Sequence, residues 1–320
     1  MSTRRIVRGV VLAGVVVVGT VFVSARFGAQ AKAQPQQPTT QAKAQPQQPT
    51  AQPQQAKAQT QQATVAEAEA ANKKLEADNA KVALDFKTGN TYLQAGQFAE
   101  SITAFRAGLQ TRADEPALLT NLSEALRRRG LKHWSDGAKA VEPESKTRSQ
   151  DLAKKDWLEA AVQAQKALLA IKQRESSLPR QPIDPQTKLG AAATRATAMR
   201  LVATRVDRSQ VDASWQAYAE NIALENDAGR KSKLKGEALQ MLFEAEANAQ
   251  AIVRSRALLK EEPEHLDAQR VLGLALFTST DKTMFREAAG LLQNYLDKAP
   301  ETDPWKEPTR EAFAFLKTMM

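Results

Sequence analysis

The chain has 320 residues, with 45 basic and 36 acidic side chains, two histidines and no cysteine. A chain without cysteine has no disulfide framework, iron–sulfur cluster or thiol nucleophile. Two histidines do not suffice for a zinc site built mainly on histidine. With 42% hydrophobic but only 5% aromatic residues, the composition favours Ala- and Leu-rich helices over a β-sandwich.

The basic excess lies at the N-terminus. No acidic residue precedes Glu67, and residues 1–64 carry a charge of +7. The remaining chain holds 38 basic and 36 acidic residues and is close to neutral. Although a basic protein usually suggests nucleic-acid binding, the folded part lacks a basic face. We therefore expect no nucleic-acid partner.

Residues 1–30 have the pattern of an export signal. Three arginines precede an uncharged stretch, Gly9–Ala25. As a helix it spans ~26 Å, slightly less than a ~30 Å hydrocarbon core, with Arg26 snorkelling to the interface. Residues 1–30 thus predict an inner-membrane anchor or, alternatively, a cleaved signal peptide. Either keeps the N-terminus in the cytoplasm and places the C-terminal domain outside it, in a periplasmic or extracellular location.

Residues 31–64 are of low complexity. The segment 31–41, AKAQPQQPTTQ, repeats nearly unchanged at 42–52. Sequence rich in Gln, Pro and Ala cannot bury a core, so we expect a disordered, partly polyproline-II linker. It acts as a spacer, or alternatively threads a cell-wall layer or serves as a ligand for a proline-reading domain.

Residues 65–130 hold an N-terminal helix extension and the first repeats. The extension, 65–81, is rich in the helix formers Ala, Glu and Lys. A small–large–small pattern then occurs twice with the same internal spacing, first as Gly89, Tyr92 and Gly96 and then as Ser123, Leu126 and Gly130. Together with Ser101-x₃-Phe105, the unit at 83–110 resembles the tetratricopeptide repeat.

The same resemblance returns in residues 229–303. Ala251, Pro263 and Gly273 have the spacing of that family, and the following helix matches it through Phe285, Ala288, Leu292 and Pro300. The resemblance implies an all-α, tetratricopeptide-like solenoid of helical hairpins, in which a small residue lets two helices approach closely. It also implies a concave surface for protein–protein interaction and no catalysis.

Three segments depart from the repeat. Residues 131–155 are interpreted as an insertion, because the partner helix expected after Gly130 begins only near Trp157. Residues 156–228 are expected to form irregular middle helices, and residues 304–320 a capping helix. Within the middle region we expect a proline-rich loop at 174–185 and helices near 187–206 and 209–226.

Motifs for chemistry are absent from the sequence. It contains no P-loop, G-x-G-x-x-G, G-x-S-x-G or H-E-x-x-H. We assign no catalytic, cofactor or metal residue and expect no enzyme. Arg127–Arg129 is expected to lie at a helix C-terminus, or alternatively to form an anion-binding rim. Trp134 is expected to anchor the insertion, and His265 to cap a helix or contact solvent.

Asn90 and Asn121 form a pair with a family precedent. Tetratricopeptide proteins that hold a peptide's C-terminal carboxylate have two asparagines at this spacing, with a lysine where this chain has Phe86. A side-chain amide both donates and accepts hydrogen bonds and can hold an extended peptide backbone. The resemblance therefore implies a more general groove for a protein or extended peptide, lined by Asn90, Gln94, Asn121, Glu124 and Arg128.

The predicted function is a non-enzymatic protein–protein interaction scaffold at the cell envelope. The alternative is an envelope enzyme with acid and base carboxylates in residues 131–226. Two acids that converge in a pocket, one with a raised pKa, would favour the enzyme.

Overall fold

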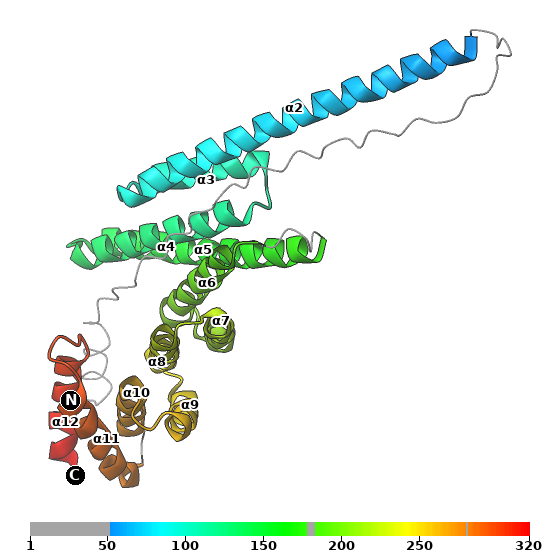
Figure 1. Ribbon diagram of the computed structural model, residues 1–320. Coiled ribbons are helices and arrows are strands. Elements are labelled where there is room, and N and C mark those ends of the chain that lie inside the picture. Colours follow the sequence, from blue (N-terminus) through cyan, green and yellow to red (C-terminus); the bar gives the residue numbers. More distant parts are fainter. Residues whose placement is uncertain (1–51, 178–182, 280) are drawn as a thin grey trace. The chain divides into compact units, whose positions relative to one another are not determined.

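The computed structural model describes residues 52–177, 183–279 and 281–320. Every regular element in these ranges is helical, which confirms the all-α class (Figure 1). The predicted membrane segment at 1–30 lies outside them, and none of the helices described is long and apolar enough to cross a bilayer. The chain divides into two compact units, one that holds α2 and α3 and one that begins at Asp114.

In the first unit, α2 (Gln52–Gln94) and α3 (Phe98–Thr111) form a hairpin. The turn between them depends on Gly96, whose φ of 73° is in the left-handed region that favours glycine. The backbone N–H of Gln97 donates to the carbonyl of Tyr92 at 2.9 Å and closes the end of α2.

The start of α2 corrects the linker boundary that we expected at residue 64. Residues 52–64 belong to the helix, whereas residues 31–51 lie outside the described ranges. The physical reason is the position of the prolines. Pro53 stands in the first turn, where proline is tolerated, and the next proline is Pro116. The Gln, Ala and Lys residues that follow Pro53 are good helix formers.

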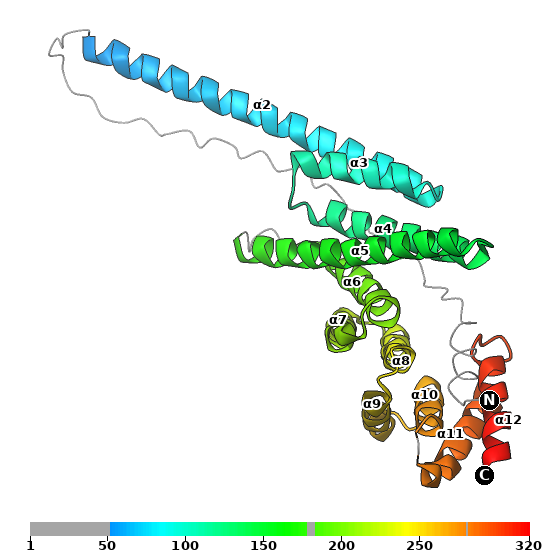
Figure 2. The same cartoon turned by 180° about the vertical axis from the view of Figure 1, so that it is seen from behind.

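The second unit is a succession of helices in which each packs against the next (Figures 1 and 2). We call α4, α6, α8 and α10 the first helices and α5, α7, α9 and α11 the second helices of its hairpins. Their bounds are α4 (Pro116–Lys139), α5 (Pro143–Ser177), α6 (Pro185–Arg205), α7 (Val211–Leu224), α8 (Ala228–Glu244), α9 (Asn248–Glu261), α10 (Leu266–Phe277), α11 (Phe285–Lys298) and the capping helix α12 (Lys306–Met319), with short 3₁₀ turns η1 (Arg208–Gln210) and η2 (Lys282–Met284).

Residues 131–155 do not form a separate insertion. They extend α4 and begin α5, so the repeat's hairpin simply continues for several more turns. Gly137 keeps the extended helices close, since a Cβ there would lie 3.0 Å from the Cβ of Ser149. Trp134 packs on Trp157 with ring centroids 5.5 Å apart, as expected of a local anchor.

The middle helices are also more regular than we expected. Residues 156–228 contain most of α5 and all of α6 and α7, and they continue the same stack. The predicted loop at 174–185 is helical at its start, because α5 runs to Ser177. From α6 to α12 the buried side chains form one hydrophobic core. At its end, Phe277 contacts the rings of Phe285 and Phe315.

Small residues set the spacing within the hairpins. A Cβ on Gly130 would lie 2.5 Å from Nε1 of Trp157, and one on Gly273 would lie 2.7 Å from Cδ2 of Leu292. Ser123 takes the glycine position in α4 and donates to the carbonyl of Ala160 at 2.6 Å. The role that the repeat pattern gives to these residues is therefore confirmed at the atomic level.

We expect Gly273→Ala to lower the free energy of unfolding by about 1–3 kcal/mol, because the added methyl meets Leu292 and the carbonyl of Ala288. Gly290 in α11 is the matched control, since nothing lies within 4 Å of a Cβ there. Gly290→Ala should stabilise by up to ~1 kcal/mol. Urea denaturation measures both free energies of unfolding. If both substitutions stabilised the protein, or both destabilised it, the close packing at Gly273 would be contradicted.

Candidate functional site

The first helices form a continuous surface in the second unit. Helix α4 contacts α6, α6 contacts α8, and α8 contacts α10. Side chains on one first helix can therefore bond to those on the next. We use the name first-helix surface for the polar side chains that these four helices present to one another and to solvent.

On α4, the carboxylate of Glu124 lies between two arginines. Arg127 donates to it from Nε at 2.7 Å and from a terminal nitrogen at 2.8 Å, and Arg128 donates from Nε at 2.6 Å. Burial alone would raise the pKa of Glu124, but the hydrogen bonds and charges of the two arginines lower it overall. Glu124 thus stays ionised and fixed in place.

The five predicted groove residues fall in different environments. Asn90 is half-buried and Gln94 exposed on α2, in the first unit. On α4, Asn121 is only 5% exposed, Glu124 is buried, and Arg128 is partly exposed. We expected Asn121 to be exposed in the groove, and it is buried instead. The reason is that α4 is covered by both α5 and α6.

The three arginines of α4 do not lie at a helix C-terminus, because α4 runs on to Lys139. Arg129 instead makes two hydrogen bonds to Asp156 of α5, at 2.6 and 2.9 Å. This contact raises the pKa of Arg129 above its ordinary value. The run Arg127–Arg129 thus serves two carboxylates, one on its own helix and one on the neighbouring helix.

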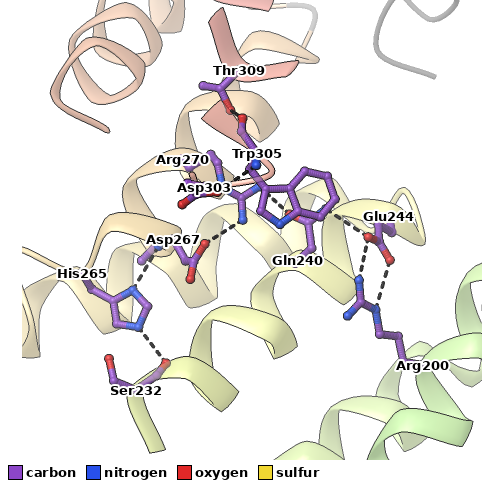
Figure 3. A network of polar contacts seen from close by, with 11 residues as sticks. Arg200, Ser232, Gln240, Glu244, His265, Asp267, Arg270, Asp303, Trp305 and Thr309 are labelled. Atoms are coloured by element: carbon purple, nitrogen blue, oxygen red, sulfur yellow. Dashed lines mark hydrogen bonds and ion pairs between the residues drawn. The ribbon is translucent and has the colours of Figure 1, made fainter. Parts of the chain in front are cut away.

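A second polar network links α6, α8 and α10 (Figure 3). Arg200 binds both carboxylate oxygens of Glu244, at 2.7 and 3.2 Å. Gln240 donates to Glu244 at 3.1 Å and accepts from Arg270 at 2.7 Å. Arg270 also donates to Asp267 at 2.8 Å. Burial opposes the charged form of Arg200, but the nearby acidic groups, Glu244 foremost, and the hydrogen bonds to Glu244 together raise the pKa of the arginine.

Arg270 is the centre of the C-terminal part of this network. It is 1% exposed, and its guanidinium carbon lies 4.8 Å from the ring centroid of Trp305 and 5.7 Å from that of Tyr295. Trp305 immediately precedes α12, so the arginine helps to hold the capping helix on the stack. No sequence motif marked this residue.

His265 caps α10, one of the two roles that we expected. Its Nδ1 accepts from the backbone N–H of Ala268 at 3.2 Å, and its Nε2 lies 3.0 Å from the carbonyl of Ser232 (Figure 3). Nε2 is therefore the protonated nitrogen when the ring is neutral. The contact ties the start of α10 to α8.

The described part of residues 131–226 does not favour the enzyme alternative. Several of its carboxylates are bound by cations, among them Asp156 by Arg129, Glu175 by Lys188 and Glu220 by Arg195. Hydrogen bonds lower the pKa of Asp136, Asp207 and Glu225, the opposite direction from that of a general acid. Within the described ranges, no group of three or more His, Cys, Asp or Glu side chains could hold a metal ion.

Comparisons with known proteins give similarity to solved structures. No family model matches the sequence, and no curated protein matches it. Among solved structures, the chain is similar to the TPR2AB domain of yeast Sti1 in its pHSP90 complex. The two are 16% identical with a TM-score of 0.27, and the match covers 74% of this chain and 98% of that chain.

We expect Arg200→Met to lower the free energy of unfolding by about 3–5 kcal/mol, because it leaves Glu244 buried without its cation. The side chains of this pair are 9% and 7% exposed. Arg208 and Glu246 make a similar two-bond pair that is 54% and 45% exposed. Arg208→Met should therefore cost no more than ~1 kcal/mol. Urea denaturation measures both. If the two variants lost the same free energy of unfolding, burial would not determine how much an ion pair contributes to stability.

Proposed function

We propose that this protein is a non-enzymatic scaffold at the cell envelope, which holds a partner protein or an extended peptide on its first-helix surface. The observation that carries the proposal is the network of ion pairs on this surface. It extends over α6, α8 and α10, and a separate set of pairs lies on α4. Side chains that are already held in place lose little conformational entropy when a partner binds, which favours recognition.

The exposed polar residues supply the contacts to a partner in this proposal. On α4, Arg128 has donors beyond the one that binds Glu124, and its side chain is 22% exposed. A guanidinium recognises carboxylates and backbone carbonyls through directed hydrogen bonds. Asn121 and Glu124 then act from below the surface, by fixing α4 and orienting Arg128. The first unit has a polar surface of its own, where the amide of Gln94 on α2 can donate to a peptide carbonyl and accept from a peptide N–H.

The envelope location rests on the N-terminal sequence. The basic flank and the uncharged stretch Gly9–Ala25 support a membrane anchor. The Gln- and Pro-rich segment that follows gives the helical part reach from the bilayer. In this arrangement the scaffold would collect its partner outside the cytoplasm while it remains attached to the inner membrane.

Membrane topology can be tested with reporters fused after Met320, which is 64% exposed. We expect an alkaline phosphatase fusion to be active and a cytoplasmic fluorescent fusion to be dark, because the positive flank retains the N-terminus inside. Replacing the three N-terminal arginines by glutamate is the control and should weaken this orientation. A fusion active only in the cytoplasm would refute the envelope location.

Partner binding can be tested with Arg128→Ala in the full chain. Glu124 keeps its two hydrogen bonds from Arg127, so the loss of stability should stay within ~1 kcal/mol. The affinity for a partner identified by in-cell crosslinking should fall by about 1.5–3 kcal/mol, since a charged donor is lost. The control is Arg310→Ala on α12, whose side chain is 48% exposed. If Arg128→Ala binds the partner with unchanged affinity, Arg128 is not part of the binding site.

A further inference from the structure

Helix α5 has an exposed apolar ridge. Leu158, Val162 and Leu169 are 46%, 51% and 55% exposed. Their spacing of four and seven residues places them on one face of the helix. Exposed aliphatic residues are ordinary when they occur singly, but these three lie on one face of one helix over about 16 Å, at 1.5 Å per residue.

The ridge borders a groove between α5 and α6. Leu158, Ala161 and Val162 form one wall and Met199 and Val202 the other, around a volume of about 480 Å³. The rest of the lining is polar or charged and consists of Gln165, Lys166, Arg195, Asp207 and Gln210. An apolar groove with a few polar groups is the geometry that receives the apolar face of a helix.

The charge next to this groove is positive. Lys155 and Lys166 are exposed and flank the ridge, and neither forms an ion pair with a carboxylate of the described residues. The acids nearby are already engaged. Asp207 accepts from the backbone N–H and the hydroxyl of Ser209 at 2.9 and 2.8 Å, and Glu220 is bound by Arg195 at 2.6 Å. Asp207 keeps its negative charge, whereas the charges of Arg195 and Glu220 offset each other, so the two lysines leave this region with a net positive charge.

We propose that the α5–α6 groove binds an amphipathic helix that carries carboxylates beside its apolar face. Its apolar residues would cover Leu158, Val162 and Met199, and its acids would pair with Lys155 and Lys166. One wall of this groove is α5 and the other is α6, and none of its lining residues belongs to the polar networks around Glu124 or Arg200. The groove would therefore hold a second partner.

Charge argues against two other occupants. A second copy of the chain that docked through the same face would bring the lysines of the two α5 helices together, and like charges across an interface are unfavourable. The N-terminal segment of the chain is also unsuitable, because it holds no acid before Glu67 and carries a positive charge. An amphipathic acidic helix from another protein can both cover the apolar residues of the groove and pair with the two lysines.

The test uses the purified full-length chain and two labelled synthetic helices of about 18 residues, long enough to form an isolated helix. Both have the same leucine face, and one is flanked by glutamate where the other has lysine. Fluorescence anisotropy measures binding at low and high salt. The variants are Val162→Asp, Lys155→Glu/Lys166→Glu and, as the matched control, Val253→Asp on α9, where Val253 is 65% exposed.

We expect the glutamate peptide to bind at least about tenfold more tightly than the lysine peptide, with a preference that falls as salt rises. Val162→Asp should weaken binding about tenfold or more, Val253→Asp should not change it, and the double lysine variant should reverse the preference. Equal binding of the two peptides, or full binding by Val162→Asp, would overturn the proposal. Self-association that Val162→Asp abolishes, without peptide binding, would assign the groove to a second copy and overturn it as well.

Discussion

The close approach of two helices at a small residue is the constraint on which this fold depends. Gly89 meets the ring of Phe105, Gly130 meets Trp157, and Gly273 meets Leu292, each at a distance that leaves no room for a Cβ. A large side chain on the second helix therefore fills the space above a small residue on the first. Because this contact fixes how the helices of a hairpin lie, it also determines which face the first helix presents to its neighbours.

The sequence predicted this constraint because its signal is local. Small residues at fixed intervals, followed by large apolar ones, placed the helices of the repeats. The prediction that residues 131–155 form an insertion was wrong, because these residues extend α4 and begin α5. Their side chains are mostly exposed, so the periodicity that marks a buried helical face is missing there. Similarly, residues 52–64 are polar and repetitive, yet Gln and Ala favour a helix once proline is absent.

The candidate site was predicted less well, because burial and pairing depend on neighbours that are distant in sequence. Asn121 has the position expected of a groove residue, but it is buried on α4, which packs against both α5 and α6. The partner of Arg200 is Glu244, 44 residues away. No spacing rule connects them, since the number of residues between two hairpins varies with the length of their turns. The arginines of α4 were visible as a basic run, but only the fold shows which carboxylates they serve.

Buried and exposed charges in the second unit have different physical consequences. The pair of Arg200 and Glu244 is shielded from solvent, so added salt screens it little, and it holds α6 against α8 under most conditions. Lys155 and Lys166 stand in water beside an apolar ridge. Their field reaches only about 8–10 Å at physiological salt, so they can select and orient a partner but add little stability to the fold. The ion pair that holds α6 against α8 is thus separate from these two lysines, so a substitution in one set can leave the other intact.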